Sequence, residues 1–183
     1  MRLGLYGGTF DPIHNGHIHV IKELITRKIV DHLLVLPAGE PRLRDNQPHA
    51  TGAQRRTMCQ LAVNELPADI KKHVEVNPIE VLREGPSYTI DTVEAVAQFY
   101  EGDTIVLVVG SDAYSKIDQW HRADELKKLV EFVVIDRPDF PGEHNTSVDA
   151  IAVSATDIRA HKSDAVPAAV AAFIKENNLY ASK

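Results

Sequence analysis

Apolar residues in this chain gather in short unbroken runs instead of alternating with polar ones. Four runs rich in Val, Ile and Leu occupy residues 3–6, 33–36, 105–109 and 132–135 of the 183 residues. A strand buried on both faces needs apolar side chains at successive positions, as in a parallel sheet that helices cover on both sides. The runs therefore predict a parallel sheet.

Helical spacing of apolar residues fills most of the chain between these runs. Ile18, Ile21, Leu24 and Ile25 fall on one face of a helix that begins near Gly16. Further helices are expected around residues 58–66, 88–100, 125–129 and 166–176, with a helical turn from residue 155 and short strands at 74–81 and 150–153. Alternating strands and helices predict an α/β fold with a doubly wound, mainly parallel sheet, in which ligands bind beyond the carboxyl ends of the strands.

The composition is that of one ordinary globular domain, which we place over residues 1–183, with a mobile loop at 38–50 and a C-terminal helical part at 154–183. A formal charge of −6 disfavours a dedicated nucleic-acid-binding protein, since such proteins rely on clustered Lys and Arg. No apolar run is long enough for a membrane helix and no secretory pattern opens the chain, so we expect a cytoplasmic protein. Cys59 is the only cysteine, which excludes an intrachain disulfide.

The segment from Gly7 to His17 carries the strongest chemical pattern, because it leaves a buried strand and enters a helix. Gly7 and Gly8 have no side chains to keep a phosphate away from the main chain. His14 and His17 lie three residues apart at the helix start, where both imidazoles can reach one point and Gly16 leaves room for a purine or ribose. The backbone amides of a helix N-terminus favour anions, so we predict a phosphate site here.

A metal site is the competing interpretation of the histidine cluster. His14, His17 and His19 are close in sequence, but helical geometry turns His19 roughly 160° away from His17. No carboxylate stands at the spacing of a zinc site. We therefore expect no metal ligand from the protein.

The segment ending in His14-Asn15-Gly16-His17 resembles the phosphate-binding signature of the HxGH nucleotidylyltransferase superfamily, in which both histidines contact the triphosphate. Residues 153–159, Val-Ser-Ala-Thr-Asp-Ile-Arg, resemble a second motif of that superfamily. There Ser154 can cap a helix whose amides, together with the Thr156 hydroxyl and the Arg159 fork, can hold phosphate oxygens. The resemblance implies a Rossmann-like nucleotidyltransferase fold.

The middle of the chain narrows this resemblance. Residues 86–92 (Pro-Ser-Tyr-Thr-Ile-Asp-Thr), 110–112 (Gly-Ser-Asp) and 120–122 (Trp-His-Arg) resemble the bacterial nicotinate-nucleotide adenylyltransferases over nearly the whole chain. That family joins ATP, carried with Mg²⁺, to nicotinate mononucleotide, and releases deamido-NAD and pyrophosphate in NAD biosynthesis. The implied partners are these two small molecules, with no nucleic acid and no membrane, and the resemblance leaves a homo-oligomer open.

The expected site residues fall into three groups. The catalytic group is His14, His17, Arg159 and Arg44. The ATP-binding group is Gly7, Gly8, Thr9, Phe10, Gly16, Gly110, Asp112, Ser154 and Thr156, and the mononucleotide-binding group is Thr89, Trp120, His121 and Arg137. Arg44, with Arg42 as the alternative, stands where the family usually has a loop Lys, and an Arg presents a planar fork instead of a point charge.

Two other functions remain open at this stage. One is a related transferase of the same fold, such as a pantetheine-phosphate adenylyltransferase or a cytidylyltransferase. Ser87-Tyr88-Thr89, Trp120 and Arg159 favour the nicotinate enzyme over these. The other is a module that binds ATP as a sensor and performs no transfer. Preference for the acid over the amide mononucleotide is implied by the resemblance alone.

Overall fold

The computed structural model describes residues 1–39 and 47–181 and contains the predicted parallel sheet. Its five strands are β1 (Arg2–Gly8), β2 (His32–Pro37), β3 (Val74–Val76), β4 (Thr104–Gly110) and β5 (Glu131–Ile135), in the order β3-β2-β1-β4-β5 and all parallel. Each of the four apolar runs lies in one of these strands, so the predicted fold class is confirmed.

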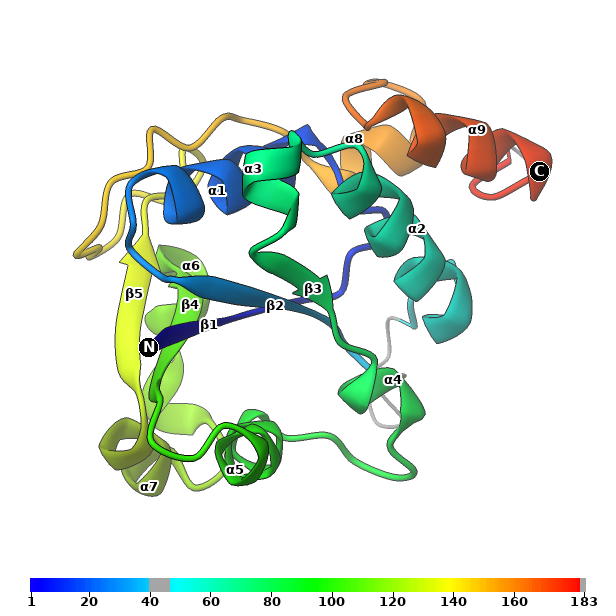
Figure 1. The fold of residues 1–183 in the computed structure, drawn as a ribbon. Coiled ribbons are helices and arrows are strands. Elements are labelled where there is room, and N and C mark those ends of the chain that lie inside the picture. The colour runs from blue at the N-terminus through cyan, green and yellow to red at the C-terminus, as the bar shows by residue number, and fades with distance from the viewer. Residues whose placement is uncertain (40–46, 182–183) are drawn as a thin grey trace.

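Helices cover both faces of the sheet (Figure 1). One face carries α1 (Asn15–Thr26), α2 (Gly52–Asn64), α3 (Ala68–Lys71), α8 (Ala155–Arg159) and α9 (Ala168–Glu176), and the other carries α4 (Ile79–Leu82), α5 (Thr89–Phe99), α6 (Ser111–Tyr114), η1 (Ile117–Gln119) and α7 (Ala123–Leu129). Leu33 and Val35 of β2 point into the first core, while Leu34 and Leu36 point into the second. Because both faces are covered, every position from Leu33 to Leu36 is apolar, which explains the unbroken runs.

Three details differ from the predicted elements. The strand expected at 74–81 stops at Val76, since Pro78 is the N-cap of α4. Residues 150–153 form no strand, because the amides of Val148 and Ala150 donate to the Asp136 carboxylate instead of a neighbouring strand. Part of the loop predicted at 38–50 lies outside the described residues.

The connections make the carboxyl ends of β1 and β4 the natural ligand site. The chain leaves β1 and β2 through helices on one face, and then reaches β4 through α4 and α5 on the other. The connections that follow two neighbouring strands therefore lie on opposite faces of the sheet. These strands are β1, which ends at Gly8, and β4, which ends at Gly110. Such a switch point opens a crevice beyond the strand ends.

A fully buried arginine ties the loops at this edge together. Arg55 of α2 is 0% exposed and donates from Nη1 to the carbonyl oxygens of Thr9 at 2.8 Å and Ala38 at 2.7 Å, and from Nε to that of Ala50 at 3.3 Å. One guanidinium thus joins the loops after β1 and β2 to the start of α2. Sequence reasoning missed this role, because an Arg in an amphipathic helix ordinarily faces water.

We expect Arg55→Met to lower the free energy of unfolding by about 3 kcal/mol, because three carbonyl groups lose their buried donor. Urea denaturation measures this change. Arg56→Met is the matched control, since Arg56 follows in the same helix and is exposed, and we expect it to change stability by no more than about 0.5 kcal/mol. Equal losses of unfolding free energy in the two variants would contradict this role of Arg55.

Candidate active site

Two imidazoles cap the first helix reciprocally. His14 is the N-cap of α1, and its Nδ1 accepts the backbone N–H of Gly16 at 3.1 Å. The Nδ1 of His17 accepts the backbone N–H of His14, also at 3.1 Å. The two rings stack, with centroids 3.7 Å apart and planes 22° from parallel. Histidines here fill the roles that Ser or Thr and Glu play in an ordinary capping box.

These hydrogen bonds assign the tautomer of both rings. A neutral imidazole has one N–H donor and one acceptor, and since each Nδ1 accepts, each proton lies on Nε2. Burial lowers the pKa of His14 to about 4, and the Arg137 guanidinium contributes to that shift. Burial also lowers the pKa of His17 well below its usual range, with His14 and Arg137 contributing. At neutral pH the pair therefore offers two uncharged Nε2–H donors.

Aromatic packing fixes the orientation of His17. The Phe10 ring meets the His17 ring edge to face, with centroids 4.9 Å apart, and Tyr6 packs on both. Phe10 is only 2% exposed and lies against Gly8, where an added Cβ would come within 3.0 Å of its ring. The side chain of Phe10, predicted to bind ATP, thus positions His17 from within the core.

Gly16 makes room for the side chain of His14. A Cβ at this position would lie 2.9 Å from Cε1 of His14 and 3.4 Å from Cβ of Val153. The space that a Cβ of residue 16 would occupy is therefore filled by the His14 imidazole and lies against Val153 of the C-terminal segment. The absence of a side chain lets the His14 ring fold back over the helix start.

Arg137 lies beside the histidines and not among the other residues predicted to bind the mononucleotide. With Tyr6, His14 and His17 it lines a recess on the α1 side of the sheet edge, and its Nε is 3.8 Å from Oδ1 of Asp112. The recess is small, at about 20 Å³, and two acidic residues, Asp136 and Asp139, also line it. Its imidazole donors and its guanidinium are groups that bind phosphate oxygens. Tyr6 was missed, because its position inside a buried strand carries no separate signal.

The second sequence motif lies against the first. Ser154 caps α8, its Oγ accepting the N–H of Asp157 at 3.4 Å, as predicted. Arg159 donates from Nη1 to the carbonyl oxygen of Asp11 at 2.8 Å and from Nη2 to Oγ1 of Thr156 at 3.3 Å. Segments 148 residues apart in the chain thus meet at the histidine loop.

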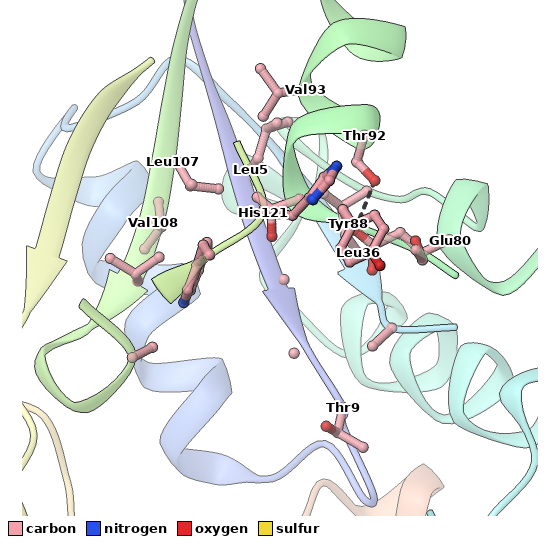
Figure 2. A pocket seen from close by; sticks show the side chains of 18 of the residues that line it. Leu5, Thr9, Leu36, Glu80, Tyr88, Thr92, Val93, Leu107, Val108 and His121 are labelled. Atoms are coloured by element: carbon pink, nitrogen blue, oxygen red, sulfur yellow. Dashed lines mark hydrogen bonds between the residues drawn. The ribbon is translucent and has the colours of Figure 1, made fainter. Parts of the chain in front are cut away.

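A larger pocket of about 610 Å³ opens on the other side of the strand ends (Figure 2). Its lining includes the predicted residues Gly7, Gly8, Thr9, Gly110, Thr89, Trp120 and His121. Tyr88 and His121 stack with ring centroids 4.2 Å apart, joining the start of α5 to the turn before α7. An aromatic wall of this kind suits a planar ring, and the glycine backbone between pocket and recess leaves a phosphate free access.

A polar network that the sequence did not reveal forms one wall of this pocket. Thr92 donates to Oε1 of Glu80 at 2.9 Å, and Nη1 of Arg83 donates to Ser87 Oγ at 2.7 Å and to Thr92 Oγ1 at 3.0 Å. Figure 2 shows Glu80 and Thr92 together beside Tyr88. Burial raises the pKa of Glu80, against the lowering effect of Thr92 and Arg83. The network fixes the segment that leads into Thr89.

Three predictions from the sequence concern the loop arginine, a metal site and a membrane helix. Arg44 and its alternative Arg42 lie outside the described residues. Within residues 1–39 and 47–181, no three His, Cys, Asp or Glu side chains are grouped as ligands for a metal ion. No helix within the same residues has the length and apolar character needed to cross a membrane.

Comparison with known proteins adds independent findings. The family described as cytidylyltransferase-like matches residues 5–161. The nicotinate-nucleotide adenylyltransferase of Bacillus subtilis (strain 168) is 32% identical, and the probable nicotinate-nucleotide adenylyltransferase of Bacillus pumilus (strain SAFR-032) is 33% identical, each over 99% of both chains. The solved structure of Plasmodium falciparum nicotinic acid mononucleotide adenylyltransferase complexed with NaAD has a TM-score of 0.81, covering 98% of this chain and 97% of that one at 18% identity. That structural likeness shows the same fold.

The histidine pair makes a prediction about titration. A pKa lowered from 6.5 to about 4 means that His14 stays uncharged as the pH falls through 6 and 5, and takes up a proton only near pH 4. In ¹⁵N-histidine NMR spectra we expect His14 and His17 to keep the Nε2–H tautomer between pH 8 and pH 5. In denaturant both should titrate near the ordinary value of about 6.5. Protonation of either ring near pH 6.5 in the folded protein would overturn the assignment.

Proposed function

The chain belongs to the cytidylyltransferase-like family and, within it, to the nicotinate-nucleotide adenylyltransferases, and on that premise we propose that it transfers the adenylyl group of ATP to nicotinate mononucleotide. The products are deamido-NAD and pyrophosphate. The observation that carries this proposal is the pair of Nε2–H donors at the switch point, with a 610 Å³ pocket on the other side of the same strand ends. The recess, at about 20 Å³, is too small for a nucleotide, so the triphosphate binds at its rim, and the larger pocket has room for the mononucleotide.

The reaction is an in-line displacement at phosphorus. A phosphate oxygen of the mononucleotide forms a bond to the α-phosphorus of ATP, the bond from that phosphorus to the bridging oxygen breaks, and pyrophosphate leaves with the electron pair. The attacking phosphate is already ionised near neutral pH, so no general base is required. Catalysis then rests on positioning and on stabilising the charge that develops on the leaving group.

The histidines supply directed hydrogen bonds in this scheme and not positive charge. His14 and His17 donate from Nε2 to oxygens of the triphosphate, and the helix N-terminus behind them favours the same anion. Arg137 brings the nearest described cationic group to the recess, and Arg159 holds the loop through the carbonyl oxygen of Asp11. Uncharged donors cost less to bury than two imidazolium ions, which is consistent with their enclosed position.

The pocket suits the mononucleotide. Trp120 and the stacked pair of Tyr88 and His121 offer aromatic surface to a pyridine ring, and Thr89 lies at the start of α5 on the same wall. Gly7 and Gly110, at the ends of neighbouring strands, leave the way open from this pocket to the α-phosphate. The acceptor phosphate would then approach from the side opposite the leaving pyrophosphate.

We assign Mg²⁺ to the nucleotide and not to a protein cage. Asp112, at the carboxyl end of β4, is the only carboxylate that sequence reasoning placed among the ATP-binding groups, and it pairs with Arg137. Mg²⁺ commonly keeps several waters and binds through substrate phosphates with one or two carboxylates, which agrees with this sparse set. When bound, the ion would neutralise part of the triphosphate charge.

Location in the cytoplasm and assembly into a homo-oligomer stay predictions.

A pyrophosphate-release assay tests the function directly. We expect ATP and nicotinate mononucleotide to yield equal amounts of pyrophosphate and deamido-NAD, while the amide mononucleotide and phosphopantetheine give lower kcat/KM under the same conditions. Greater activity with phosphopantetheine, or with CTP in place of ATP, would support a related transferase. Binding of ATP with no transfer to any acceptor would support a sensor module.

We expect His17→Asn to lower kcat by roughly 10²-fold or more, because one donor to the phosphates is lost while the cap is kept. The side-chain oxygen of Asn can replace Nδ1 as acceptor for the His14 amide, whereas nothing replaces Nε2–H. Steady-state kinetics and thermal unfolding separate the two effects. A variant with unchanged stability and unchanged turnover would refute the role of the histidine.

A further inference from the structure

A buried carboxylate lies in the loop that leads to His14 and lines neither the recess nor the pocket. Asp11 is 5% exposed and comes three residues before His14. Its Oδ2 accepts the N–H of His49 at 2.8 Å, and its Oδ1 accepts the N–H of Ala50 at 3.1 Å. A third donor is the hydroxyl of Tyr180, 2.7 Å from Oδ1. Charged acceptors of this kind are costly to bury unless their hydrogen bonds are satisfied.

The third donor comes from the far end of the chain, 169 residues away. Tyr180 follows α9, and its carbonyl oxygen lies 2.6 Å from Nε2 of His161, near α8. Leu179 and Tyr180 pack against the core on the α1 face of the sheet. Burial, together with the bond to Asp11, raises the pKa of the Tyr180 hydroxyl, so that it remains a protonated donor at neutral pH.

The path from this bond to the reacting groups is short. Asp11 is followed by Pro12 and by Ile13, which is fully buried, and then by the N-cap His14. The carbonyl oxygen of Asp11 accepts from Arg159, so side chain and main chain of one residue are both held by the C-terminal part. Few backbone angles separate this anchor from the rings, and a small shift of the loop moves both imidazoles.

We propose that Tyr180 is a positioning residue for adenylyl transfer, acting through Asp11 to hold the loop in which the His14 and His17 donors converge. The bond restrains the loop between Phe10 and His14 at a point that lines neither the recess nor the pocket. Without the hydroxyl, Asp11 keeps two backbone donors and the loop gains alternative positions. If the imidazole donors are misplaced by a fraction of an ångström, stabilisation of the transition state falls more than the affinity for the substrates does. The kinetic side of this inference rests on the proposed function.

Tyr180→Phe tests the proposal, because it removes the hydroxyl and keeps the packed ring. We expect kcat to fall roughly 10-fold, with the KM values of both substrates within about 2-fold of the wild-type values. The control is Tyr100→Phe, since Tyr100 packs against the core on the opposite face of the sheet. A fall in kcat no larger than in the control, or a change confined to KM, would overturn the proposal.

Histidine NMR provides a readout that needs no substrate and that loss of stability alone would not move. In wild type, His14 and His17 should each show one Nε2–H tautomer, whereas in folded Tyr180→Phe we expect mixed tautomers or broadened signals at these two rings. Unchanged spectra would contradict the proposal. If the spectra change in Tyr180→Phe but the wild-type protein makes no deamido-NAD, the proposed function fails while the positioning of the loop by Tyr180 stands.

A double-mutant cycle with Asp11→Ala tests whether Tyr180 acts through Asp11. Ala removes both acceptor oxygens, so no hydrogen bond from the Tyr180 hydroxyl to residue 11 can form. If both residues act through one bond, the double variant should lose no more kcat than Asp11→Ala alone. Losses that multiply would mean that Tyr180 acts by another route and would overturn the proposal.

Discussion

The amide groups at the start of α1 need hydrogen-bond acceptors, and two imidazole Nδ1 atoms provide them. This single arrangement determines much of the site. Because each Nδ1 accepts, each ring carries its proton on Nε2, and the stacked rings present both protons at the same edge of the sheet. The hydrogen bonds that cap the helix therefore also set the direction of the Nε2–H donors before any ligand binds.

The surroundings serve to keep that cap in place. Phe10 packs against the ring of His17, and the absent side chain of Gly16 makes room for that of His14. Arg55 and Asp11 are buried charges that satisfy or recruit backbone groups from several loops at the carboxyl ends of β1 and β2. Enzymes that neither form nor break a bond to a protein atom depend on such preorganisation, since positioning is most of what the protein contributes.

The sequence was informative where a local pattern carries the physics. Strands buried on both faces need apolar residues throughout, so the runs at 33–36 and 105–109 marked β2 and β4 without ambiguity. The glycine and histidine spacing from Gly7 to His17 likewise marked a strand, a loop and a helix start. Contacts between distant segments left no such trace. Nothing in the sequence around Arg55 or Tyr180 predicts the groups that they bind. Arg137 lies with the histidines because β5 ends beside β4, and only the order of the strands in the sheet shows that these two are neighbours.

A crystal structure with a non-hydrolysable ATP analogue would test the central claim most directly. The account predicts that Nε2 of His14 and Nε2 of His17 both lie within about 3 Å of phosphate oxygens, with both Nδ1 atoms still accepting backbone amides. A triphosphate bound away from this helix start, with the two imidazoles contacting only protein atoms, would contradict it.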